Sequence, residues 1–174
     1  MPAAQTVEKP NFDTVWAILQ EVAQSQKETA RQMGKFHNRF GEVVEYMIAP
    51  NLCDKFREIG LIFPKANNKT KVKDYENNIH FEIDVMLENS DKAMLIEVKT
   101  KLKTEDVNDH ISRLEKMRNY ANLHNDKRNF LGAVASVIMT SNVKEYALKQ
   151  GFFAIEPSGE SFRITPPQGQ PKEW

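Results

Sequence analysis

The middle of the chain carries the clearest pattern of apolar and polar positions. In residues 79–88 every second side chain is apolar, which is the period of a β-strand. Residues 93–99 are mostly apolar until Glu97 and Lys99, and the four residues that separate the two stretches are turn-forming. The pattern therefore predicts a β-hairpin.

The register of this hairpin follows if its loop is formed by the four residues 89–92. One face then carries only apolar cross-strand pairs, which are Ile83 with Val98, Val85 with Ile96, and Leu87 with Met94. On the other face Asp84 falls opposite Glu97, and Glu82 falls opposite Lys99. Because strand side chains alternate, Glu97 and Lys99 point to the same face.

Two carboxylates that face each other on a half-buried sheet repel, so the Asp84–Glu97 pair is destabilising unless something lies between them, and a divalent metal ion is the simplest candidate. Mg²⁺ takes hard oxygen ligands, usually one or two carboxylates together with water and phosphate oxygens. An ammonium beside such a site, here Lys99, can orient a water molecule and offset the charge of a phosphate group. The alternative is that these are ordinary strand-end charges, with Lys99 paired to Glu82.

The dipeptide Ile83-Asp84, followed after the turn by Glu97-Val98-Lys99, resembles the motif of the PD-(D/E)XK nuclease superfamily, with Ile83 in place of proline. The separation of the two acids is similar to that in archaeal Holliday-junction resolvases. The chain is more similar still to an uncharacterised branch whose N-terminal coiled-coil run ends in an F-G-x-x-x-E helix, here residues 40–45. The resemblance covers roughly residues 12–165. It implies an α/β fold with a mixed β-sheet flanked by helices, the restriction-endonuclease-like αβββαβ core.

The resemblance also implies a metal-dependent nuclease that hydrolyses phosphodiester bonds of nucleic acid, with a DNA endonuclease as the leading form. Its metal ion, Mg²⁺ or Mn²⁺, would be bound by Asp84, Glu97, the main-chain carbonyl of Val98 and Glu45. Lys99 would position the hydrolytic water. The alternative is a catalytically silent nucleic-acid-binding or coiled-coil assembly module on the same fold. The three intact motif side chains favour the enzyme, whereas the neutral net charge favours the module.

The helix-borne acid lies in a helix expected from residue 34 or 35 to Leu52. Its apolar face comprises Phe36, Phe40, Val43, Val44, Met47 and Ile48. Glu45 lies at the border of this face, whereas Glu42 lies nearly opposite to it. We take Glu45 as the acid that completes the site, as in the resembled branch, with Glu42 as the second choice. The alternative is two solvated glutamates.

A shorter apolar stripe at helical spacing precedes this helix and comprises Val15, Trp16, Leu19, Val22 and Ala23. It either folds back on the domain or mediates self-association, and the resemblance favours a homo-oligomer formed through this helix. The predicted organisation is an arm and coiled-coil-like helix at residues 1–33, a nuclease-like domain at 34–165 and a flexible tail at 166–174.

The chain has 24 basic and 24 acidic residues, so a nucleic acid would have to bind a local basic patch. Lysines gather in residues 65–73, an edge strand or loop, and again after the hairpin. The candidate nucleic-acid-binding residues are Lys69, Lys71, Lys73, Lys101, Lys103 and Arg113. The alternative for the first group is a lysine-protected sheet edge, a common protection against aggregation.

The rest of the chain predicts the same fold from periodicity alone. A short helix is expected at residues 51–59, ended by Gly60, with a brief strand at 61–63. The later elements are a helix at about 104–123 with Thr104 as N-cap, a buried strand at 130–139, a helix at 142–150, and strands at 152–155 and 161–165. This order implies a mixed sheet between helical layers. On the long helix, His110 or Arg113 could approach the site.

The N-terminal residues 1–10 are neither a signal peptide nor a transit peptide, and no apolar run approaches the length of a membrane span. The single cysteine, Cys53, allows no intrachain disulfide. We therefore expect a cytoplasmic protein without a membrane partner.

Overall fold

The structure, a computed structural model, describes residues 13–21, 51–158 and 161–174. Glu42, Glu45 and the predicted boundary at residue 33 lie outside the described residues. The helix-borne acid and most of the coiled-coil segment therefore stay predictions.

Six strands form one mixed sheet, in which their spatial order is their order along the chain. They are β1 (Lys65–Asp74), β2 (Ile79–Glu88), β3 (Lys92–Lys101), β4 (Asn129–Ile138), β5 (Phe153–Ser158) and β6 (Ser161–Thr165). The first three strands are antiparallel, β3, β4 and β5 are parallel, and β6 returns antiparallel to β5. The predicted α/β class with a mixed sheet is confirmed. β4, in the parallel part of the sheet, has the continuous apolar sequence that burial on both faces requires.

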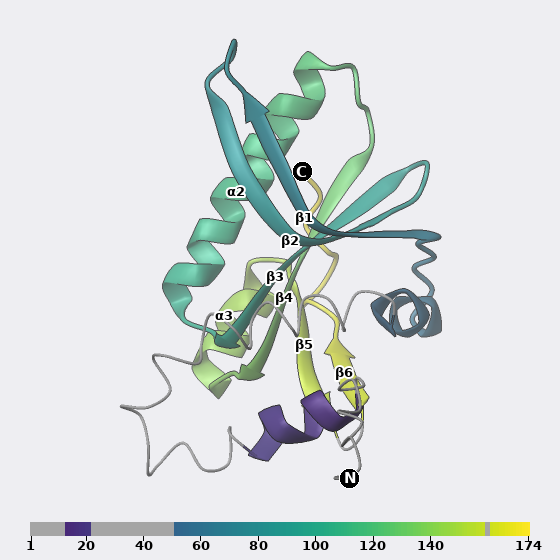
Figure 1. Cartoon of the computed structure of the whole chain (residues 1–174), viewed down its shortest axis with the longest axis vertical. Coiled ribbons are helices and arrows are strands. Elements are labelled where there is room, and N and C mark those ends of the chain that lie inside the picture. The colour runs from purple at the N-terminus through teal and green to yellow at the C-terminus, as the bar shows by residue number, and fades with distance from the viewer. Residues whose placement is uncertain (1–12, 22–50, 159–160) are drawn as a thin grey trace, which may run out of the picture.

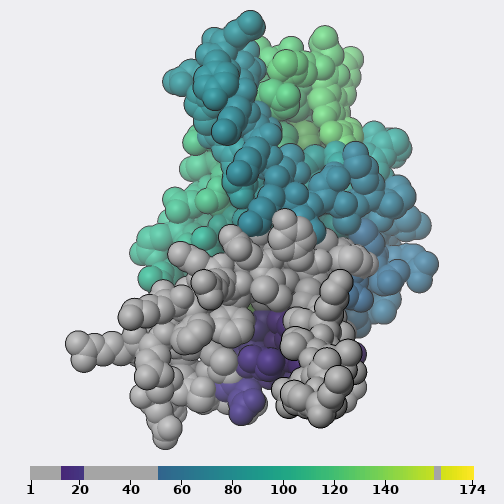
Figure 2. All heavy atoms as spheres, viewed as in Figure 1, coloured from purple at the N-terminus to yellow at the C-terminus, as the bar shows by residue number. Residues whose placement is uncertain are grey.

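Helices cover both faces of this sheet (Figure 1). α2 (Thr104–Leu123) and α3 (Ser141–Lys149) pack on one face through a shared apolar cluster. The helical residues 13–21 and 51–58 pack on the opposite face through a second cluster. The β1–β2 hairpin and the C-terminal end of α2 project together at one end of the molecule (Figures 1 and 2).

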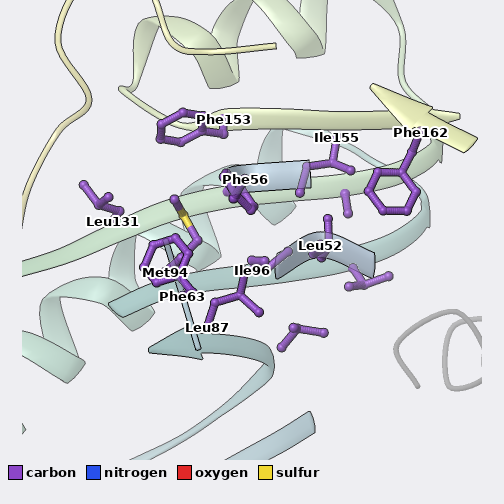
Figure 3. Packing of buried hydrophobic residues seen from close by; sticks show 14 of the residues in the cluster. Leu52, Phe56, Phe63, Leu87, Met94, Ile96, Leu131, Phe153, Ile155 and Phe162 are labelled. Carbon is purple, nitrogen blue, oxygen red and sulfur yellow. The ribbon is translucent and has the colours of Figure 1, made fainter. Parts of the chain in front are cut away.

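The second cluster is built around aromatic side chains (Figure 3). The ring of Phe56, from the helix at residues 51–58, lies edge-on to Phe153 of β5, with centroids 5.5 Å apart. It also lies edge-on to Phe63, at 6.0 Å. Leu52, on the same helix, is fully buried against the same face of the sheet. These contacts fix the helix to the sheet.

Val15, Trp16 and Leu19, the described part of the apolar stripe, are buried in this same cluster. Val15 and Trp16 are 7% and 3% exposed, and Leu19 is fully buried. The Trp16 ring meets Phe162 of β6 edge-on, with centroids 5.8 Å apart. The described part of the stripe therefore folds back on the domain, which was the alternative to self-association. Its packing gives no support to the expected oligomer.

Residues 61–63 form no strand, which corrects the prediction, and the first strand is the lysine-rich β1 instead. Gly60 ends the preceding helix with a φ of 89°, a backbone conformation that glycine adopts readily. The Leu61 N–H then donates to the Phe56 carbonyl at 2.9 Å. This hydrogen bond satisfies a carbonyl in the last turn of the helix. Only a short link then remains before Pro64.

The remaining elements lie within a few residues of their predicted bounds. Thr104 is the first residue of α2 rather than its N-cap, a position that Lys103 occupies. The Lys103 N–H donates to the Asp106 carboxylate at 2.8 Å, so an acid in the first turn stabilises the helix start.

The C-terminal residues 166–174 pack against the domain, which contradicts the predicted flexible tail. Trp174 exchanges two main-chain hydrogen bonds with Phe130, of 2.9 and 3.0 Å. Its ring lies 5.5 Å from that of Phe152, and Glu173 is 2.8 Å from the Lys92 ammonium. The polar, proline-rich composition suggested mobility, but these contacts offset the entropy cost of ordering the segment.

We expect Trp16→Ala to destabilise the domain by about 3 kcal/mol, because it removes a nearly fully buried indole from the core. Ile18, on the same helix but 41% exposed, provides the matched control. Ile18→Ala should change the unfolding free energy by less than about 0.5 kcal/mol. Urea unfolding measures both. If Trp16→Ala instead lowered the mass in light scattering and left the stability unchanged, the helix would be a contact between subunits of an oligomer.

Candidate functional site

The β2–β3 hairpin has the predicted register near its turn. Val85 pairs with Ile96, and Leu87 pairs with Met94. The side-chain carbonyl of Asn89 accepts hydrogen bonds from the main chain within the turn, which fixes the loop. The regular ladder ends at the Val85–Ile96 pair.

β2 departs from β3 at Asp84. Oδ2 of Asp84 accepts a hydrogen bond of 2.8 Å from the Val98 N–H, at a point where a regular ladder would offer a main-chain carbonyl. Ile83 packs in the cluster beneath α2, whereas Val98 packs in the opposite cluster. The predicted Ile83–Val98 pair is therefore wrong, because the alternation of side chains along β2 breaks at this point.

β1 changes conformation at the same level of the sheet. Lys69 has a φ of 51°, which is uncommon for a residue other than glycine. The Lys69–Asp84 pair is missing from the otherwise continuous β1–β2 ladder. The irregularities of both strands thus coincide, and Lys69, a predicted nucleic-acid-binding residue, lies across from the predicted catalytic acid.

Glu97, on β3, is only 2% exposed, and each of its oxygens has a cationic partner. Oε2 accepts a hydrogen bond of 2.6 Å from Nη1 of Arg113, in the middle of α2. Oε1 lies 3.2 Å from Nζ of Lys99. A carboxylate so far removed from water requires partners of this kind. Arg113, predicted as a nucleic-acid-binding residue, is thereby placed within the site.

Asp84 lies close enough to Glu97 for the two acids to interact. Burial, together with the charge of Glu97, raises the pKa of Asp84 from an ordinary value of 3.8 to about 6. The Val98 N–H and the charges of Lys99 and Arg113 act in the opposite direction. The repulsion between the two predicted acids is thus present, although they do not form a regular cross-strand pair.

Lys99 remains a cation in this setting. Burial by itself would lower its pKa, but the carboxylate of Glu97, with smaller effects from Asp106 and Asp84, raises it above the ordinary value. The lysine side chain is 40% exposed, so its ammonium reaches both Glu97 and solvent. Glu82, the alternative partner of Lys99, instead lies 3.6 Å from Lys71 of β1.

An open groove of about 630 Å³ lies over these charges, between β2, β3 and α2. Residues that line it and were not predicted as site residues are His80, Phe81, Glu82, Asp109, Ser112 and Lys116. Helical spacing could have indicated two of them, because Asp109 and Lys116 lie four residues before and three residues after Arg113. The groove is thus lined by both acids and bases.

His110 does not reach the groove. It is fully buried, and its Nε2 lies 2.9 Å from the Leu95 carbonyl, to which a neutral imidazole can donate. Burial lowers its pKa to about 4. Of the two residues that could approach the site from α2, only Arg113 does so.

The other predicted basic residues divide into two groups. Lys71 and Lys73 border a second hollow of about 290 Å³, which shares His80 with the groove. Lys101 and Lys103 are exposed at the end of β3 and just before α2, and neither lines the groove. The structure therefore connects the first pair, but not the second, to the site.

The oxygen donors at the site suit Mg²⁺ or Mn²⁺. Because the N–H and C=O of an extended residue point to the same strand edge, the Val98 carbonyl lies on the edge that faces Asp84. Within the described ranges, no group of three or more His, Cys, Asp or Glu side chains could hold a metal ion. A divalent cation would relieve the repulsion between Asp84 and Glu97. The described residues thus supply two carboxylates as oxygen donors, and both oxygens of Glu97 already have cationic partners.

Comparisons with known proteins do not place the chain in a family. No family model and no curated protein matches it. One solved structure with a partial likeness is a protein of unknown function, AF1548, with 18% identity and a TM-score of 0.45. The likeness covers 63% of this chain and 58% of that one, and it is too weak to support an argument. Among the described helices, none is long and apolar enough to cross a membrane.

We expect Asp84→Asn to stabilise the protein above pH 6 and to have little effect near pH 4. The pKa of Asp84 in the folded state exceeds 3.8, so folding favours the protonated acid. The resulting penalty is absent below about pH 4, grows as the pH rises to about 6, and is complete above it. Its size at neutral pH is about 1–3 kcal/mol. Urea unfolding at pH 4, 6 and 8 measures it.

Asp91→Asn, which changes an exposed aspartate in the β2–β3 turn, is the control for this experiment. Its effect should not follow the same pH profile. Equal unfolding free energies of wild type and Asp84→Asn at pH 8 would contradict the repulsion between Asp84 and Glu97.

Proposed function

We propose that the chain is a metal-dependent phosphodiesterase that acts on nucleic acid, and specifically a DNA endonuclease. The observation that carries this proposal is the convergence of Asp84, Glu97, Lys99 and Arg113 in one open groove. Two acids that can hold a divalent ion and two cations that can contact a phosphate suit metal-assisted phosphodiester hydrolysis.

Asp84 and Glu97, with the Val98 carbonyl, would hold Mg²⁺ or Mn²⁺, and Glu45 would complete the site. A divalent ion bound there would polarise a phosphoryl oxygen and lower the pKa of a bound water molecule. The raised pKa of Asp84 supports this assignment, because burial and the neighbouring charge of Glu97 both disfavour the ionised acid, and a bound cation would offset both effects.

Lys99 would orient the attacking water and stabilise the negative charge that develops on the phosphoryl oxygens. Its position supports this role, since the ammonium is 3.2 Å from Glu97 and the side chain is still 40% exposed. The raised pKa of Lys99 keeps it protonated at neutral pH, so it acts as a fixed positive charge rather than as a base.

Arg113 would serve two purposes in succession. Its bond to Glu97 orients the carboxylate, and its remaining N–H donors are suited to a phosphate oxygen. Lys116, three residues further along α2, adds a second positive charge on the same wall of the groove. The backbone of a nucleic acid would thus lie against α2.

A second candidate is a catalytically silent nucleic-acid-binding module on the same fold. One observation favours it: Arg113 and Lys99 already neutralise Glu97 without a metal ion. The two candidates differ in a single requirement, because only the enzyme needs a divalent cation at Asp84.

The direct test is incubation of the full chain with duplex, single-stranded and branched DNA and RNA, with Mg²⁺, Mn²⁺ or a chelator. The proposal requires cleavage that appears with a divalent ion and stops with chelator. Binding without cleavage under every metal condition would favour the silent module.

We expect Lys99→Ala to keep the fold and to lower the cleavage rate about 10²- to 10³-fold, because loss of one group that stabilises transition-state charge typically has this effect. Lys92→Ala is the matched control: Lys92 lies at the opposite end of β3 and pairs with Glu173 outside the groove. Single-turnover cleavage measures both. Turnover of Lys99→Ala at the wild-type rate would remove Lys99 from the mechanism.

We expect millimolar Mg²⁺ or Mn²⁺ to raise the melting temperature of the wild type and to have a much smaller effect on Asp84→Asn. An ion that binds only the native state stabilises it increasingly as its concentration exceeds the dissociation constant. Glu45→Gln should weaken the response if Glu45 completes the site, and Glu42→Gln is its matched control. Equal metal-induced shifts in wild type and Asp84→Asn would exclude the metal site.

A further inference from the structure

The tip of the β1–β2 hairpin carries an exposed aromatic pair that the proposed chemistry does not use. Tyr75, in the turn, is 77% exposed, the highest exposure among the large hydrophobic side chains of the described residues. Its ring lies 5.1 Å from that of His80, with 58° between the ring planes. Exposure of this extent leaves most of the tyrosine ring available to a ligand.

The turn that holds Tyr75 is fixed by its own hydrogen bonds. The Asp74 carboxylate accepts one of 3.0 Å from the Asn77 N–H and one of 2.9 Å from the Asn77 side chain. Asn78 adopts the left-handed conformation, with a φ of 53°. Asp74 also lies 3.5 Å from Nε2 of His124, just beyond the C-terminal end of α2. The aromatic pair is thus held in place at the projecting end of the molecule (Figures 1 and 2).

A continuous surface leads from this tip to the candidate active site. His80 lines both the groove and the adjacent hollow, which Lys71 and Lys73 also border. Across the β1–β2 ladder, Lys73 pairs with His80, and Lys71 pairs with Glu82. Four residues of strand separate His80 from Asp84, which is roughly 13 Å. The aromatic pair therefore lies a few nucleotides away from a phosphate bound at the site.

The charges along this surface nearly cancel. Glu82 lies 3.6 Å from the Lys71 ammonium, and Asp74 lies beside the aromatic pair in the turn. Counterion release would consequently contribute little here, and contact with base faces would contribute more. Inside a duplex those faces are covered by neighbouring bases, so along the strand an unpaired base is the one that can stack on a protein ring.

We propose that Tyr75 and His80 form a stacking platform for an unpaired base of the strand that enters the groove. The substrate class is then a nucleic acid with a single-stranded segment a few nucleotides from the cut. This inference rests on the proposed function for the identity of the ligand as nucleic acid. It adds a requirement for unpaired bases, which the metal site alone does not impose.

The test measures affinity in the presence of chelator, so that cleavage does not enter. The probes are a fluorescent 12-nucleotide single strand and the blunt duplex of the same sequence, and the readout is anisotropy. Tyr75→Ala should weaken binding of the single strand roughly tenfold, because stacking on an aromatic ring contributes about this much. Binding of the duplex should change less than twofold.

Three variants complete the experiment. Tyr75→Phe keeps the ring and should bind the single strand as the wild type does. Ile62→Ala removes another exposed apolar side chain, 65% exposed, and should change neither affinity. Lys73→Ala should change both affinities by the same small factor, since it removes a charge rather than a stacking surface.

Two results would overturn the platform: an equal loss of both probes in Tyr75→Ala, or wild-type protein that does not prefer the single strand. A platform that exists only to bind protein would produce the second result. Failure of the proposed function gives a different outcome, in which the wild type shows the predicted binding pattern but no divalent ion produces cleavage.

Discussion

The site depends on one buried carboxylate. Glu97 is almost removed from water, and a charge in that position persists only when cations and hydrogen bonds replace the solvent. Arg113 and Lys99 supply them from different elements, α2 and β3. Loss of such a partner from a buried ion pair typically costs about 3–5 kcal/mol. The packing of α2 against the sheet therefore stabilises the charge of Glu97, because it holds Arg113 beside this carboxylate.

The departure of β2 from β3 at Asp84 has a related effect. If the hairpin were regular, the Val98 N–H would bond a main-chain carbonyl. Instead Asp84 takes that position, and its side chain is drawn toward β3 at the level of Glu97. β1 is irregular at the same level, at Lys69, so β1 and β2 stay paired on both sides of the break. The hairpin thus continues toward the end of α2, where Asp74 lies beside His124 (Figure 1).

The sequence predicts β2 to β6, the described helices and the hairpin register near the turn, because these follow from the local periodicity of side chains. It left β1 open as a strand or a loop and wrongly placed a strand at residues 61–63. It does not predict the break at Ile83, since nothing in an apolar alternation indicates that a side chain replaces a ladder carbonyl. The contact of Arg113 with Glu97 depends on how α2 crosses the sheet, which a single sequence does not specify. The packing of Trp174 depends on its main-chain hydrogen bonds with Phe130, which the composition of the tail does not indicate.

An arginine at position 113 suits a site that would alternate between two charge states, one without and one with a bound cation. A guanidinium offers five donors in a fixed plane, whereas a lysine ammonium is a point charge with three donors. Under the proposed function, Arg113 would neutralise Glu97 when no metal ion is bound and would bind a phosphate oxygen when a metal ion is present. The same side chain that stabilises the empty groove would then face the substrate. The contacts of Arg113 and Lys99 with Glu97 thus explain how this carboxylate stays buried beside the partly buried Asp84.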